Sequence, residues 1–161
     1  MNKSKHNTYL VLMAVQNICE GMQRTDATAK DSNTPEDRLH PNSRASIKRI
    51  LAKIQDAMPT YQPKTASDGR FMMDVATKLR IMWADDESIP RPAFVAVALN
   101  LVVDHKETLP QNATNARALL DSLEGMLATL YSHMDPDNEA LDDMNHGEKL
   151  AREYAQIAFA A

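Results

Sequence analysis

Apolar residues recur at every third or fourth position along much of this chain, and this spacing constrains the fold more than any other feature. The clearest example lies in residues 43–58, whose large apolar side chains are Ile47, Ile50, Leu51, Ile54 and Met58. Such spacing places side chains on one face of an α-helix. The remaining positions are mostly polar, so we expect an amphipathic helix that covers an apolar core.

The same periodicity predicts further helices at residues 8–22, 68–83, 94–103, 114–133 and from Asp135 onward. The segment 94–103 is apolar almost all round, which is typical of a helix covered by its neighbours. Its valines also allow a buried strand. A chain of 161 residues has the length of one ordinary domain. We therefore expect a single all-α domain over residues 1–161, a compact bundle of five to six helices around a central apolar helix at about 93–104.

Residues 24–42 interrupt this pattern. They contain Thr, Asp, Ser, Asn and two Pro, and Leu39 is their only large apolar residue. Such a segment buries too little apolar surface to offset the entropy lost on ordering. We therefore expect a long polar loop at about 24–42, and loops of this length inside a compact domain are usually functional or disordered.

Charge is distributed unevenly along the chain. Residues 1–80 hold 13 Lys and Arg against 8 Asp and Glu, whereas residues 81–161 hold 5 against 14. The predicted 43–58 helix carries Arg44, Lys48, Arg49 and Lys53 away from its apolar stripe. Such a basic face can attract an acidic protein or neutralise the phosphates of a nucleic acid.

Several kinds of chemistry lack their sequence signatures. There is no glycine-rich phosphate loop, no His-Glu-x-x-His and no Cys-x-x-Cys. The acidic run that begins at Asp135 fails as a calcium loop, because its sixth position is Ala140 and its twelfth is His146. Acidic residues at a helix start are explained by the helix macrodipole. We expect no metal site, no cofactor and no catalytic residue that order alone can identify.

The compartment is inferred from the single cysteine and from the apolar runs. Cys19 cannot form an intramolecular disulfide, and its apolar surroundings indicate a buried side chain. Lys3 and Lys5 precede the apolar run 9–15 as in a signal peptide, but no small-residue cleavage site follows. No apolar run approaches the roughly 20 residues that span a bilayer. We expect a cytoplasmic protein without a membrane partner.

These observations favour a non-enzymatic protein-interaction module, an adaptor or inhibitor that acts by surface binding. Its contact residues would be Arg44, Lys48, Arg49 and Lys53. The partner is expected to be a protein, and a second copy of the chain also fits. One alternative is a nucleic-acid-binding protein that uses the same basic face of the 43–58 helix. Another is a helical enzyme whose site is dispersed over several elements.

Overall fold

The structure, a computed structural model, describes residues 3–35, 38–62 and 91–134, together with the single residues 65, 70, 149, 151 and 152. These residues contain helices and no strand. The helices are α1 (Lys3–Asp31), α2 (Pro41–Tyr61), α4 (Arg91–Thr108) and α5 (Thr114–Met134). The all-α class predicted from the apolar spacing is confirmed, and the segment 94–103 is helix and not strand.

The described ranges hold four helices, fewer than the five or six that the periodicity predicted. The helices predicted at residues 68–83 and beyond Asp135 fall almost entirely outside the described residues. None of the helices in the described ranges combines the length and the apolar character needed to cross a lipid bilayer.

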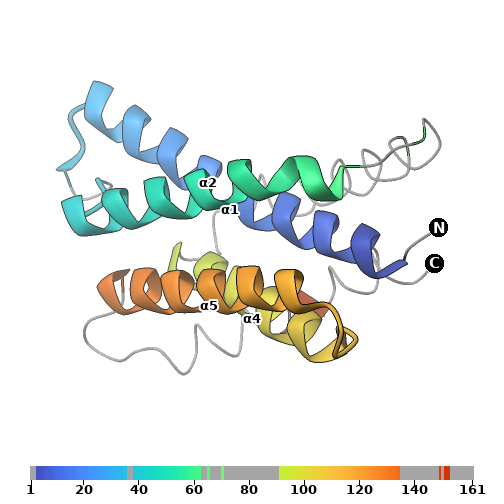
Figure 1. Ribbon diagram of the computed structural model, residues 1–161. Helices are drawn as coiled ribbons and strands as arrows, with labels where there is room; N and C mark the ends of the chain where they lie inside the picture. Colours follow the sequence, from blue (N-terminus) through green and yellow to red (C-terminus); the bar gives the residue numbers. More distant parts are fainter. Residues whose placement is uncertain are drawn as a thin grey trace.

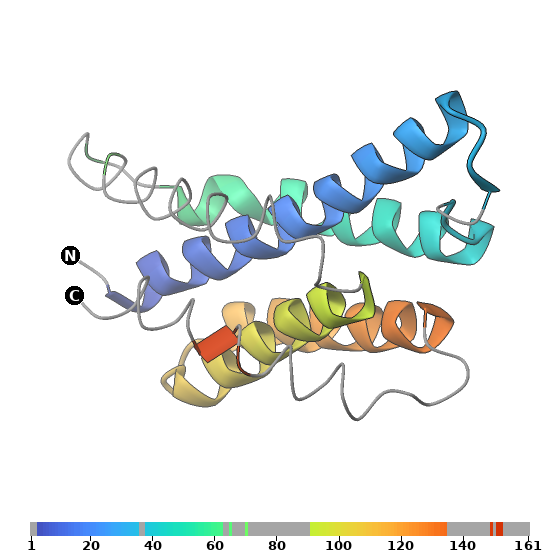
Figure 2. The ribbon, with the colours of Figure 1, turned by 180° about the vertical axis from the view of Figure 1, so that it is seen from behind.

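The four helices form two antiparallel hairpins, one stacked on the other (Figure 1). Residues 32–40 join α1 to α2, and residues 109–113 join α4 to α5. The hairpins meet where α1 packs on α4 and where α2 packs on α5. Figure 2 shows the same two layers from behind. Each helix therefore has two principal neighbours in this part of the chain.

The core lies between the two hairpins, and every helix contributes to it. Its largest fully buried side chains are Leu10, Val11 and Leu12 of α1, Ile47, Ile50 and Ile54 of α2, and Leu120, Leu123, Leu127 and Leu130 of α5. Cys19 is also fully buried, as predicted, and burial raises the pKa of its thiol to about 12. The thiolate is therefore suppressed at neutral pH, and Cys19 acts as a packing residue.

Helix α4 does not occupy the centre of the described helices. It packs on α1 and α5, but the segments expected to complete its surroundings, 68–83 and the residues beyond Asp135, lie almost entirely outside the described residues, so its central position in the whole chain stays a prediction. Its apolar character all round still corresponds to burial, since the consecutive residues 95–98 are all fully buried. Ala151 also belongs to the same core cluster as α4.

The polar loop predicted at about 24–42 is much shorter, because α1 continues to Asp31. The helix then ends in a hydrogen-bonded C-terminal motif. The N–H of Asn33 donates to the carbonyl of Lys30 at 3.4 Å, and that of Thr34 donates to the carbonyl of Ala29 at 2.9 Å. Asn33 has a φ of 55°, the left-handed conformation that this motif requires. The connection is thus confined to residues 32–40.

Asp26 explains how a segment with few apolar residues stays helical. The residue is only 8% exposed, and Oδ1 of its carboxylate accepts hydrogen bonds from Arg38 Nε and from the backbone N–H of Leu39, each at 2.8 Å. Arg44 lies 3.8 Å from Oδ2. These contacts tie the connection and the first turn of α2 to the end of α1. Polar anchoring therefore replaces the apolar burial that the sequence pattern lacked.

Helix α2 extends beyond the predicted 43–58 at both ends. Pro41 occupies its first turn, where a missing N–H costs nothing, and the Nδ1 of His40 accepts from the N–H of Asn42 at 3.1 Å. At the other end the helix passes through Pro59 and ends at Tyr61. Pro59 leaves only the carbonyl of Gln55 without its helical donor. Gln55 is exposed, so water can replace that donor.

Candidate functional site

The four cations predicted as contact residues lie along α2 but do not share one face. Successive helical residues are separated by about 100°, so Arg49 lies roughly 140° around the helix from Arg44. Arg44 faces α1, where it pairs with Asp26. Arg49 faces α5 and lies in a groove there. Lys48 lies one turn after Arg44, and Lys53 lies one turn after Arg49. The structure therefore places two cations at each edge of α2.

Three of these cations have no partner among the residues that the structure describes. Lys48, Arg49 and Lys53 are exposed, and none of them forms an ion pair or hydrogen bond in the part of the chain that the structure describes. Arg44 differs, because it is half-buried and shares the carboxylate of Asp26 with Arg38. We refer to Lys48, Arg49 and Lys53 as the free cations of α2.

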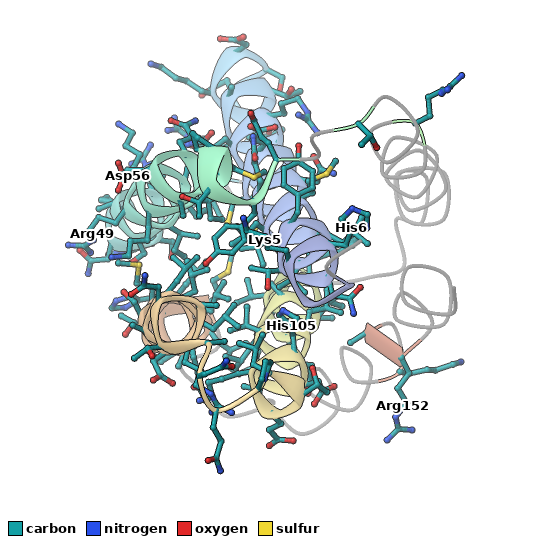
Figure 3. The ribbon with its side chains drawn as sticks, turned by 45° about the vertical axis from the view of Figure 1, so that its right-hand side comes forward. Lys5, His6, Arg49, Asp56, His105 and Arg152 are labelled. Atoms are coloured by element: carbon teal, nitrogen blue, oxygen red, sulfur yellow. The ribbon has the colours of Figure 1, made fainter. Side chains whose placement is uncertain are left out.

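An open groove of about 420 Å³ lies between α2 and α5. Its walls are formed by Ser46 and Arg49 of α2 and by Asp121, Ser122, Gly125, Met126 and Thr129 of α5. Figure 3 shows Arg49 reaching outward from α2 on the side of α5. The groove therefore combines one free cation, two serine hydroxyls and the apolar side chain of Met126.

Ser46 carries a buried hydroxyl that lacks a partner. The residue is only 4% exposed, and its Oγ forms no hydrogen bond with any described residue. A buried hydroxyl without a partner costs about 1–3 kcal/mol. Serine within a helix commonly bonds to the carbonyl four residues earlier. Ser46 does not, so its donor and acceptor capacity is unused at the wall of the groove.

Gly125 keeps the opposite wall open. It lies in the middle of α5, where glycine costs about 1 kcal/mol relative to alanine. A Cβ built at this position meets no atom within 4 Å, so packing does not require a glycine there. The absence of a side chain leaves room in the groove.

The acidic side chain of the groove is already paired. Lys106 of α4 donates to Asp121 at 2.9 Å and to Glu124 at 2.6 Å. Hydrogen bonds to Glu124 and to Asp121, with their negative charges, raise the pKa of Lys106. Lys106 carries one positive charge for two carboxylates and therefore offsets the charge of Asp121 only in part, while Arg49 is the cation of the groove that has no ion pair among the described residues.

His105 lies away from the groove, inside the bundle. Figure 3 shows it between α4 and α1, and its Nε2 is 2.7 Å from the hydroxyl of Thr8. The two residues are 5% and 1% exposed. Burial lowers the pKa of His105 to about 4, so the imidazole is neutral at pH 7. The pair acts in packing between α1 and α4.

The acidic run that begins at Asp135 lies outside the described residues. Among the residues that the structure does describe, no group of three His, Cys, Asp or Glu side chains could hold a metal ion. Comparison with protein-family models, with characterised proteins and with solved structures finds no match to the chain.

Sequence reasoning located the free cations of α2 but missed the groove beside them. Two signals could have revealed it. Ser46, like Ser43, stands among buried positions of α2 that are otherwise aliphatic, and Gly125 interrupts the leucine-rich α5. Neither signal indicates that the two residues lie opposite each other, because that depends on how α2 and α5 pack.

Proposed function

We propose that this protein is a non-enzymatic interaction module that binds a partner protein through the exposed surface of α2. The observation that supports this proposal is the presence of three free cations on one helix. Some cations elsewhere are engaged, as in the pairs of Arg38 with Asp26 and of Lys106 with Glu124, whereas exposed Arg24 and Lys30 of α1 have no ion pair among the described residues. Free surface cations steer an acidic partner toward the surface and speed its association.

The distribution of ion pairs also supports a separate basic surface. Asp26 pairs with Arg38 and Arg44, all in the basic half of the chain, and Lys106 pairs with Asp121 and Glu124, all in the acidic half. These pairs join residues of the same half. The surplus positive charge on α2 therefore remains available to a partner.

The same cations also support nucleic acid binding as a second candidate function, because lysine and arginine neutralise phosphates. Two observations favour the protein partner. The free cations are spread around α2 and do not form a single track. Tyr61, the aromatic residue nearest to them in the sequence, packs against the core and is not an open platform for unpaired bases.

An anisotropy titration with labelled single- and double-stranded DNA and RNA at two salt concentrations separates the two candidates. The test variant is Lys48→Glu with Lys53→Glu. The control is Arg24→Glu with Lys30→Glu, which makes the same charge change at exposed positions of α1. We expect both variants and the wild type to bind nucleic acid equally weakly. Salt-sensitive micromolar binding that the test variant alone loses would assign the surface to nucleic acid.

A further inference from the structure

The α2–α5 groove has the features of a binding site for an anion. Arg49 is its cation without an ion pair among the described residues, and Lys53 lies one turn further along the same edge of α2. Ser46 and Arg49 are three residues apart, so their side chains are neighbours on the helix surface, with Cβ atoms about 5–6 Å apart. The Oγ of Ser46 is buried, so a ligand group that pairs with the guanidinium also contacts the hydroxyl once the Ser46 side chain rotates toward the groove.

The chemistry of these residues selects a carboxylate. A carboxylate has two acceptor oxygens, one for the Ser46 hydroxyl and one for the guanidinium of Arg49. A phosphate group would bring up to two negative charges to a groove with one cation. It would also face the carboxylate of Asp121, whose charge Lys106 only offsets. A ligand group with a single negative charge matches these groove charges better than a phosphate does.

The size and lining of the groove favour a carboxylate that belongs to a polypeptide segment over a small free carboxylate. Its volume of about 420 Å³ lies in the range of sites that hold whole ligands, and it exceeds what one carboxyl group fills. Met126 offers apolar contact beside the polar residues, and the space above Gly125 admits a backbone or side chain. An acidic residue flanked by apolar residues meets all of these features.

We propose that the α2–α5 groove binds a glutamate or aspartate side chain on an extended segment of the partner protein, with Arg49 pairing with the carboxylate and Ser46 donating a hydrogen bond to it. The proposal rests on the protein-interaction function and names the chemistry of the partner. It also gives the unpaired hydroxyl of Ser46 and the glycine at position 125 a common role.

The test uses nuclear magnetic resonance of the isotopically labelled full chain, with the tripeptide acetyl-Leu-Glu-Leu-amide as the probe. Its matched control is acetyl-Leu-Gln-Leu-amide, which keeps the shape and lacks the charge. We expect saturable shifts of the backbone amides of Ser46, Arg49 and Gly125 with the glutamate peptide. The glutamine peptide should bind about tenfold more weakly, because a charged hydrogen bond is lost. Equal binding of the two peptides, or no shift at these amides, would overturn the proposal.

Two substitutions separate binding from folding. Gly125→Leu should fill the groove and abolish the shifts without lowering the thermal midpoint, because Cβ has free space and leucine is the better helix former. Ala128→Leu, at an exposed position of α5 outside the groove, should bind like the wild type. Ser46→Ala should raise the thermal midpoint yet weaken binding, a combination that a purely structural serine does not give. Unchanged peptide binding by Gly125→Leu would contradict the proposed site.

Two further measurements identify the source of the carboxylate and separate a failure of the groove proposal from a failure of the proposed function. If sodium acetate binds the groove as tightly as the glutamate peptide, the site takes a small carboxylate, and the assignment to a partner segment is wrong. Lys48→Glu with Lys53→Glu leaves Ser46, Arg49 and Gly125 intact. Peptide binding by this variant should persist at the groove, and its loss would contradict the groove as the site. If the variant keeps peptide binding but also keeps the protein partner in cells, the proposed function of the α2 surface is wrong while the groove stands.

Discussion

Asp26→Ala is expected to lower the free energy of unfolding by about 3 kcal/mol. The substitution leaves the guanidinium of Arg38 and the backbone N–H of Leu39 without their acceptor. A buried backbone N–H and a part-buried guanidinium that lose their common acceptor are together strongly destabilising, since hydrogen bonds to a charged group each contribute about 1.5–3 kcal/mol. Urea denaturation at neutral pH, followed by circular dichroism, measures the effect directly.

Asp31→Ala is the matched control, because Asp31 is an exposed aspartate in the last turn of the same helix. Its negative charge lies near the C-terminal end of the helix dipole, so alanine should be neutral or slightly stabilising there. A change of less than about 0.5 kcal/mol in Asp26→Ala, similar to that of an ordinary surface substitution, would show that Asp26 does not anchor the connection.

Acid is expected to destabilise the protein through His105 between pH 6.5 and 4. Burial lowers the folded-state pKa from 6.5 to about 4, so the unfolded chain binds the proton more readily. The stabilisation is complete above pH 6.5 and is lost as the pH falls toward 4. A shift of this size corresponds to roughly 3 kcal/mol. Urea denaturation at a series of pH values should show this loss.

His105→Gln removes the titrating group while keeping an amide that can contact Thr8. The variant should be less stable at neutral pH, and its stability should vary little between pH 6.5 and 4. Asp26 contributes separately. Burial acts to raise its pKa, but hydrogen bonds from Arg38 and Leu39 and the charges of Arg38 and Arg44 outweigh burial and lower it. Its stabilisation is therefore lost at still lower pH. A wild type as flat as the variant would contradict the neutral, buried His105.

Apolar periodicity predicted the helices well where packing determines them. The stripes of α2 and α5 face the core as expected, since burial of these side chains stabilises the helix. Apolar periodicity failed at the end of α1, where polar contacts and not apolar burial hold the last residues in the helix. The carboxylate of Asp26 reaches residues 12 and 13 positions away, and no local pattern encodes such a pairing. Asn33 was the local signal for the true helix end, because asparagine adopts the left-handed conformation more readily than most residues.

The candidate site was predictable only in part, for a related reason. Charge on the exposed positions of a helix follows from residue spacing, so Lys48, Arg49 and Lys53 could be recognised in the sequence. The pairing of Arg44 with Asp26 could not be predicted, because the two residues lie on different helices. The groove depends on the approach of α2 to α5, which spacing within either helix does not determine.

Site-specific photo-cross-linking tests most directly whether the exposed surface of α2 binds a protein. A photoreactive residue replaces Ala52, which is exposed on α2 between the free cations, and a control replaces the exposed Ala118 of α5. We expect a single discrete protein adduct at position 52 that persists after nuclease treatment and disappears in Lys48→Glu with Lys53→Glu. Position 118 should give none. An adduct at position 52 that nuclease removes, equal adducts at both positions, or no adduct at all would contradict a protein-binding surface on α2.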